Sequence, residues 1–246
     1  MNADPAAQLA LLSLQGIDSQ LSQLSHRRKT LPSLAVLADC HQRGTELHSR
    51  TVELSTSLKD IATEQSRMEA DIDMVRQRET RDQQRLASGG IPAKELTGLE
   101  HELETLKRRQ SALEDEALEI MEQRETVETD LTAAQAAEAV VADQRAAAEA
   151  ERDAAFAEID AVVRSKQAER EPLAATISAD LIAMYDKIRD TRDGVGAAAL
   201  KQRRCEGCRI ELAGSELNAV RAAAPDDVVR CDNCRRILVR TPESGL

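Results

Sequence analysis

Apolar residues recur at alternating steps of four and three along much of the chain. Between Leu99 and Lys166 the steps need no phase shift, and fourteen of the twenty positions are apolar. The positions are Leu99, Leu103, Leu106, Gln110, Leu113, Ala117, Ile120, Arg124, Val127, Leu131, Ala134, Glu138, Val141, Arg145, Ala148, Arg152, Ala155, Ile159, Val162 and Lys166. A period of 3.5 residues is typical of a coiled coil, in which the apolar seam packs against a partner helix. The pattern therefore predicts a long helix with one buried seam.

The same spacing runs through an upstream stretch, whose positions are Leu47, Thr51, Leu54, Leu58, Ile61, Gln65, Met68, Ile72, Val75, Glu79, Asp82 and Leu86. Between the two stretches, Gly89 and Gly90 suit the end of one helix and Pro92 the first turn of the next. We therefore expect an antiparallel helical hairpin with its tip near residues 87–93, in which polar seam residues fix the register. The heptads leave one alternative open, a parallel homodimer without a turn.

Two further prolines predict helix boundaries. Pro32 indicates a break near residues 30–33, and Pro172 is expected to open a final helix near 172–191. In a hairpin this helix lies beside the N-terminal segment, where its apolar residues would close a three-helix base. These residues are Leu173, Ile177, Leu181, Met184 and Ile188. The predicted coiled-coil domain spans residues 1–193.

Composition supports a mainly α, elongated chain. The 246 residues include no Trp, one Tyr and one Phe, and 31% are charged, which is unlike a wide globular core. The sequence contains no apolar run of about 18 residues, and its start lacks the basic flank of a secretory signal. We expect a cytoplasmic protein with no membrane partner. Cys40, alone in a helical stretch, is interpreted as a small packing residue.

Four cysteines form two Cys-x-x-Cys pairs near the end of the chain, Cys205 with Cys208 and Cys231 with Cys234. Four thiolates suit tetrahedral zinc, and two such pairs are typical of a zinc ribbon with a knuckle at the tip of each short hairpin. Residues 194–246 are too few to fold by apolar burial alone, so a metal would hold them together. We predict one structural Zn²⁺ ion in a small C-terminal β zinc ribbon over 194–246.

Two other chemistries use the same residues. An iron–sulfur cluster also accepts four thiolates and stays an alternative that visible colour would reveal. A redox pair would need a single Cys-x-x-Cys in a βαβ setting, which the sequence does not indicate. With four thiolates, zinc has no open position for water, and no nucleophile–base pair or phosphate-binding glycine loop is recognisable. We expect no enzyme activity, no catalytic residue and no small-molecule substrate.

These motifs also resemble a known family. The hairpin pattern, "CEGCRIEL", "RCDNCRRIL" and "PAKELTGLEHELETL" after the tip are similar to bacterial C4-type zinc-ribbon proteins with an N-terminal coiled coil. The resemblance covers essentially the whole chain. It implies contacts of the ribbon and coiled coil with proteins and nucleic acid and, for some members, a link to flagellar or type III secretion machinery. One departure is that Arg209 and Arg235 stand after the cysteine pairs, where such ribbons often have glycine because the knuckle favours positive φ.

Charge is divided unevenly between the two domains. Residues 1–196 carry a formal balance of −13, whereas residues 197–246 carry +2. The candidate binding residues are the arginines around the cysteines, namely Arg203, Arg204, Arg209, Arg230, Arg235, Arg236 and Arg240. Guanidinium groups bind carboxylates and phosphates alike, but they could equally offset the thiolates and nearby acids. The leading hypothesis is a protein-interaction adaptor with an unidentified protein partner. The alternative is an RNA- or DNA-binding protein that uses the ribbon.

Overall fold

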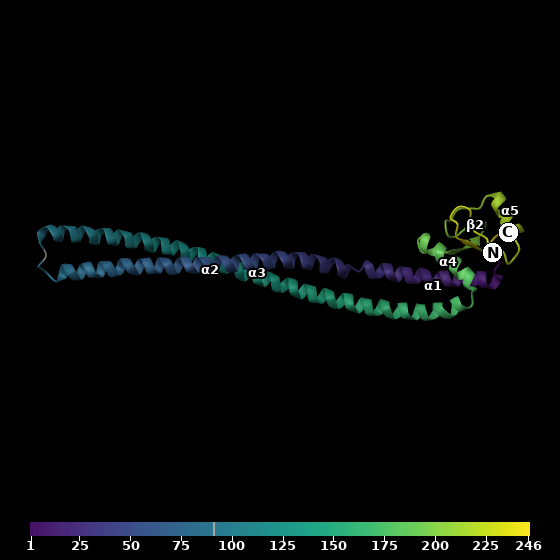
Figure 1. Ribbon diagram of the computed structural model, residues 1–246, viewed down its shortest axis with the longest axis horizontal. Coiled ribbons are helices and arrows are strands. Elements are labelled where there is room, and N and C mark those ends of the chain that lie inside the picture. Colours follow the sequence, from purple (N-terminus) through teal and green to yellow (C-terminus); the bar gives the residue numbers. More distant parts are fainter. Residues whose placement is uncertain (91) are drawn as a thin grey trace. The chain divides into compact units, whose positions relative to one another are not determined.

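The structure is a computed structural model that describes residues 1–90 and 92–246, with no side-chain description at residue 93. The described elements are α1 (Pro5–Lys29), α2 (Pro32–Ala87), α3 (Ala93–Ala175), α4 (Ala179–Thr191), β1 (Ala197–Lys201), β2 (Arg204–Cys205), α5 (Gly214–Ala222) and β3 (Ile237–Arg240) (Figure 1). The chain divides into two compact units, one formed by Val36–Ala148 and the other by Met1–Ala35 with Glu149–Leu246.

In the first unit, α2 and α3 run side by side in opposite directions (Figure 1). Arg43 bonds to Gln144 at 3.2 Å, and Arg76 pairs with Glu114 at 2.8 Å, so numbers rise on one helix as they fall on the other. The predicted antiparallel hairpin is confirmed, and the parallel dimer is not needed to bury the seam. Helix α2 ends at Ala87 and α3 begins at Ala93, at the predicted tip. Ile91, within that tip, lies outside the described residues.

The buried side chains of this unit follow the predicted seam. On α2 these include Leu54 and Ile72. On α3 they are Leu99, Leu113, Ile120, Ala134, Val141 and Ala148. Arg124 and Gln65, two polar seam positions, meet across the helices at 3.1 Å. This polar contact can be made in only one alignment and so favours one register.

Packing in the second unit joins α1, the end of α3 and α4. Its core includes Leu11 and Leu14 of α1 and Leu181 and Tyr185 of α4. The predicted apolar residues Leu173, Ile177, Met184 and Ile188 also lie in or against this core. The three-helix base predicted from the heptads is therefore present.

The start of the last helix differs from the prediction. Pro172 does not open it: α3 continues through Pro172 to Ala175, and α4 begins at Ala179. Pro172 has no amide hydrogen to donate and its ring crowds the carbonyl oxygen four residues earlier, and the helix ends three residues after it. Ser178, in extended backbone, precedes the first turn of α4.

A buried carboxylate links the three helices of the base. Asp18 of α1 accepts hydrogen bonds from Arg170 of α3 at 2.6 Å, from Tyr185 at 2.7 Å and from Arg189 at 2.9 Å. Burial would raise the pKa of Asp18, but these donors outweigh it and hold the pKa below its ordinary value. Burial and the neighbouring carboxylate together raise the pKa of Tyr185, which therefore stays a donor.

The ribbon belongs to the same compact unit as this base. Ala197, Ile237 and Val239 of the ribbon complete the core formed by α1 and α4. At the N-terminus, the Ala3 amide donates to the Asp226 carbonyl oxygen at 2.7 Å. Helices α1 and α4 share one core with the ribbon sheet, because a domain as small as the ribbon cannot bury all of its own apolar residues.

Three short strands make the ribbon sheet, in the order β2-β1-β3. Strand β1 pairs with β2 in antiparallel fashion, with Leu200 opposite Cys205. It pairs with β3 in parallel, with Ala198 opposite Leu238. The sheet thus places the first cysteine pair beside β1 and the second just before β3.

Candidate metal centre and ribbon surface

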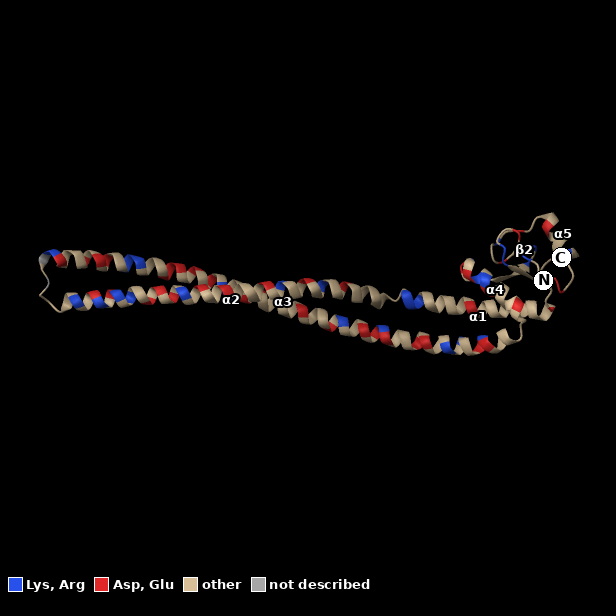
Figure 2. Cartoon of the chain, in the orientation of Figure 1, with Lys and Arg blue, Asp and Glu red and all other residues tan. Residues whose placement is uncertain are grey.

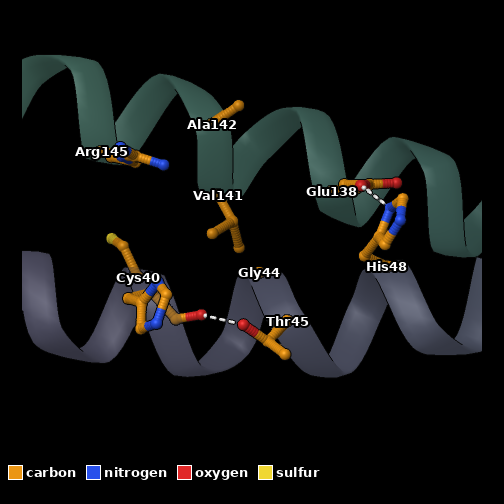
Figure 3. A pocket seen from close by; sticks show the side chains of 9 residues that line it. Cys40, Gly44, Thr45, His48, Glu138, Val141, Ala142 and Arg145 are labelled. Atoms are coloured by element: carbon orange, nitrogen blue, oxygen red, sulfur yellow. Dashed lines mark hydrogen bonds and ion pairs between the residues drawn. The ribbon is translucent and has the colours of Figure 1, made fainter.

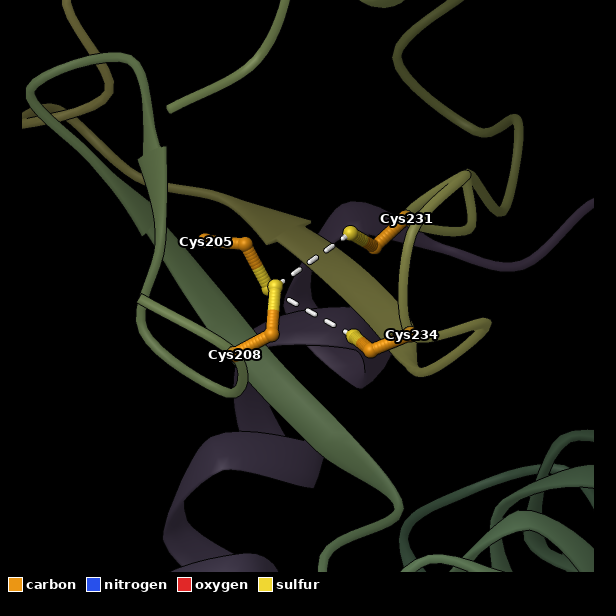
Figure 4. A group of neighbouring side chains, drawn as sticks. All are labelled: Cys205, Cys208, Cys231 and Cys234. Atoms are coloured by element: carbon orange, nitrogen blue, oxygen red, sulfur yellow. Dashed lines mark hydrogen bonds between the residues drawn. The ribbon is translucent and has the colours of Figure 1, made fainter. Parts of the chain in front are cut away.

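The four cysteine sulfurs lie together at the edge of the ribbon sheet and point toward one another (Figure 4). All four Sγ atoms are within 4.8 Å of one another, and the Cys205–Cys234 and Cys208–Cys231 separations are both 3.9 Å. Sulfurs around tetrahedral zinc at about 2.3 Å stand about 3.8 Å apart. The predicted ligand set is therefore brought together at a spacing that fits zinc.

Two knuckles with the same hydrogen bonding hold the sulfurs. In the first, the Cys205 amide donates to the Ile210 carbonyl oxygen at 3.0 Å, and the Arg209 amide donates to the Cys205 carbonyl oxygen at 2.6 Å. In the second, the Cys231 amide donates to the Arg236 carbonyl oxygen at 3.0 Å, and the Arg235 amide donates to the Cys231 carbonyl oxygen at 2.8 Å. The matching bonds orient each cysteine pair in the same way toward the centre.

Arg209 and Arg235 adopt the left-handed backbone that their positions require. Their φ values are 60° and 64°. Glycine would reach this region without crowding its side chain, whereas arginine is strained there. The departure from the family pattern thus leaves the knuckle geometry intact at a cost in conformational energy.

The surroundings of the thiols affect their ionisation differently. Burial raises the pKa of the Cys205 thiol and of the Cys231 thiol. At Cys234 burial also acts to raise the pKa, but hydrogen bonds from the Arg236 amide and neighbouring thiols outweigh it and lower the pKa. Zinc, when bound, would favour the thiolate form of all four residues and close the coordination with sulfur alone. The site is suited to structural support.

Two of the predicted binding arginines have other partners. Arg236 is buried and donates to the backbone carbonyl oxygens of Val195, Gly207 and Arg192, each at 3.0 Å. Arg240 donates to four carbonyl oxygens, those of Ala223, Ala224, Pro225 and Asp227. Both guanidinium groups bond to the protein's own backbone, which corrects their prediction as binding residues.

The other five predicted arginines, Arg203, Arg204, Arg209, Arg230 and Arg235, have exposed side chains. Arg235 lies 3.7 Å from Asp232, and the Arg230 Nε atom donates to the Arg235 carbonyl oxygen. Ile210, which directly follows Arg209, is also exposed, with 48% of its surface accessible. Sequence reasoning missed Ile210 because an isoleucine after a knuckle reads as part of a short buried strand.

A separate hollow lies between α2 and α3 in the hairpin unit (Figure 3). It forms where Gly44 faces Val141, and His48 contacts Glu138 across it at 3.2 Å. Cys40 is 2% exposed and its sulfur points toward α3, which confirms it as a packing residue. Only the four ribbon cysteines group as metal ligands in the described part of the chain, so the histidines here do not make a second metal centre.

None of the helices described in residues 1–90 and 92–246 has the combination of length and apolar character that a bilayer crossing requires.

Comparison with known proteins agrees with both parts of the structure. The model of the CT398-like coiled coil hairpin domain family matches residues 14–193, and that of the C4-type zinc ribbon domain matches residues 204–238. An uncharacterized protein of Mycobacterium tuberculosis strain H37Rv is 39% identical over 241 residues, which cover 98% of each chain.

Two solved structures share the fold. A Mycobacterium smegmatis protein has a TM-score of 0.85 at 37% identity, over 98% of this chain and 100% of that one. CT398 from Chlamydia trachomatis has a TM-score of 0.78 at 20% identity, over 96% and 98% of the two chains, and shows likeness of fold alone. The chain therefore belongs to the bacterial family of CT398-like coiled-coil hairpin proteins with a C4-type zinc ribbon.

Proposed function

We propose that this chain is a non-enzymatic adaptor that binds a protein partner through the surface of its zinc ribbon. One zinc ion, held by the four cysteines, would fix that surface without taking part in a reaction. The proposal places the adaptor in the cytoplasm, where thiols stay reduced and available to the metal. The hairpin would then present the ribbon-bound partner to a second protein.

Exposure of Ile210 is the observation that carries this proposal. Its side chain is 48% accessible although it directly follows the first knuckle. Arg209 precedes it, and Arg204 lies across the isolated β-bridge to Glu211. An apolar centre with arginines at its edge is the anatomy of a protein–protein contact, since the apolar group gains by losing water and arginine offers several donors to a partner.

Nucleic-acid binding is the second candidate, favoured by the five exposed arginines. Phosphate contact would need no apolar centre, and it would weaken steeply with salt. The ribbon has no aromatic residue on which a base could stack, since Phe156 and Tyr185 both precede residue 194. The acidic body of the chain would also repel a nucleic acid that extended beyond the ribbon.

A crosslinking pull-down from native lysate tests the adaptor directly. The comparison is between wild-type protein, Ile210→Ser and Val52→Ser, since Val52 is an equally exposed apolar residue in the hairpin unit at 52%. We expect a defined protein that crosslinks to wild type and Val52→Ser but is lost with Ile210→Ser. Recovery of nucleic acid alone, or of the same proteins with all three, would contradict the proposal.

The nucleic-acid alternative has its own test. Arg203, Arg204, Arg209 and Arg235 are changed together to Ser, while Arg236 and Arg240 stay because they bond to the ribbon backbone. If the wild-type protein retains RNA or DNA on a filter and this variant does not, the result supports nucleic-acid binding through the ribbon. If retention is absent or unchanged, these four arginines do not bind nucleic acid.

A further inference from the structure

Two large apolar side chains on α3 point away from the coiled-coil seam. Leu118 is 58% exposed and Met121 is 54% exposed, and they stand three residues apart, one above the other on the helix. Ile120 between them is 6% exposed because it belongs to the seam. The pair is therefore not needed to hold α2 and α3 together.

The pair lines a shallow groove between α2 and α3. Its other lining residues are Gln65 of α2 and Glu122, Arg124, Glu125 and Glu128 of α3. All of these residues lie within the hairpin unit. Leucine and methionine offer a contact surface that adapts to different apolar partners.

Figure 2 shows the acidic and basic residues along α3. The α3 residues that line the groove belong to an acidic segment of that helix. Residues 114–130 contain eight acidic residues and one basic residue, Arg124. Arg124 already bonds to Glu128 at 2.9 Å and to Gln65 at 3.1 Å, so its charge is compensated locally. Within the described residues, Glu122 and Glu125 have no ion-pair partner. Their charges are available to a molecule that enters the groove.

We propose that this groove, here called the acidic groove, binds a basic amphipathic helix of a protein partner. The helix would place two apolar side chains one turn apart against Leu118 and Met121, with Lys or Arg on both sides facing Glu122 and Glu125. A second copy of this chain is disfavoured because it would bring the same acidic segment, and like charges would face each other.

This inference rests on the proposed adaptor role, because an adaptor needs a second binding surface besides the ribbon. The two claims nevertheless fail separately. The ribbon proposal depends on Ile210, whereas the acidic groove is tested with variants of α3 that leave the ribbon unchanged.

The test measures binding of a fluorescent helical peptide with leucine on one face and lysine on the other, by anisotropy at low and physiological salt. Full-length wild type is compared with Leu118→Gln/Met121→Gln and with Glu122→Gln/Glu125→Gln. The matched control is Val52→Gln/Met74→Gln, which changes two apolar residues of α2 that are 52% and 60% exposed. A twin peptide with glutamate in place of lysine tests the charge requirement.

We expect the Leu118/Met121 variant to bind the lysine peptide about tenfold more weakly than wild type, with the control unchanged. The Glu122/Glu125 variant should bind more weakly and show a flatter salt dependence. Equal binding by all variants, or equal binding of the glutamate peptide, would overturn the proposal. So would a wild-type dimer that becomes monomeric in the Leu118/Met121 variant, because the occupant would then be a second copy.

Discussion

Arg236 donates a hydrogen bond from its Nη1 atom to the backbone carbonyl oxygen of Gly207 at 3.0 Å, and this bond joins the second cysteine pair to the first. The approach is close: a β-carbon at Gly207 would lie 2.8 Å from the Arg236 Cδ atom. An arginine that the sequence suggests for partner binding thus supports the metal centre. The neighbouring Arg235 is the exposed one.

Replacement of Arg236 should destabilise the ribbon far more than replacement of Arg235. Arg236→Gln removes the buried guanidinium and leaves the carbonyl oxygens of Val195, Gly207 and Arg192 without their donor, so we expect a loss of about 3 kcal/mol in unfolding free energy. Arg235→Gln changes an exposed side chain and should cost less than about 0.5 kcal/mol. Urea unfolding of the zinc-loaded proteins checks this. Equal stability of the two variants would show that Arg236 does not support the fold.

Asp18 should give the base a stability that depends on pH. The lowered pKa means that its contribution is present above the ordinary value of 3.8 and is lost as pH falls through the still lower folded value. We expect Asp18→Asn to cost about 3 kcal/mol at pH 7, because Arg170 and Arg189 lose their shared carboxylate. The difference from wild type should shrink once the pH is below 3.8. Urea unfolding of both proteins across pH measures it, and a difference independent of pH would refute the assignment.

The left-handed arginines predict that glycine stabilises the knuckles. Arg209→Gly and Arg235→Gly should each raise the unfolding free energy by about 1 kcal/mol, since φ values of 60° and 64° strain any residue with a β-carbon. Alanine at the same positions is the control, because it removes the guanidinium but keeps the strain. Thermal unfolding in excess zinc distinguishes them. If alanine stabilises as much as glycine, charge and not backbone strain is the cause.

Gly196 is predicted to be intolerant of a side chain. A β-carbon there would lie 2.6 Å from both the carbonyl oxygen and a ring carbon of Tyr185, which is fully buried. Gly196→Ala should therefore cost about 3 kcal/mol. Gly214→Ala is the matched control, because nothing lies within 4 Å of the added carbon. Calorimetry of the two variants should show a large fall in Tm for Gly196→Ala alone.

The hairpin could be predicted from the sequence because a coiled coil is encoded locally. Buried seam residues such as Leu113 and Ile120 recur in a seven-residue repeat that can be read from the sequence. The adjacent glycines Gly89 and Gly90 mark the turn. The cysteine ligands were equally predictable, since Cys-x-x-Cys spacing is set by the metal. The extension of α3 past Pro172 was not, because a proline near a helix end reads like one at a helix start.

The partners of individual arginines depend on contacts between distant parts of the chain. Arg236 bonds to Val195 and Gly207 only because the ribbon sheet brings three separate segments together. Nothing beside Arg236 in the sequence distinguishes it from Arg235. The exposure of Ile210 has the same origin, since its apolar character predicts burial and only the folded ribbon leaves it accessible.

We predict that the four cysteines hold one structural zinc ion, on which the fold of the ribbon and its proposed binding surface both depend. Native mass spectrometry of the purified full-length protein, with elemental analysis of the same sample, tests it directly. We predict one zinc ion per chain and no visible absorption. The Cys208→Ser variant should lack the mass of the zinc ion. A brown sample that contains iron and sulfide, or a folded ribbon that contains no metal, would contradict the account.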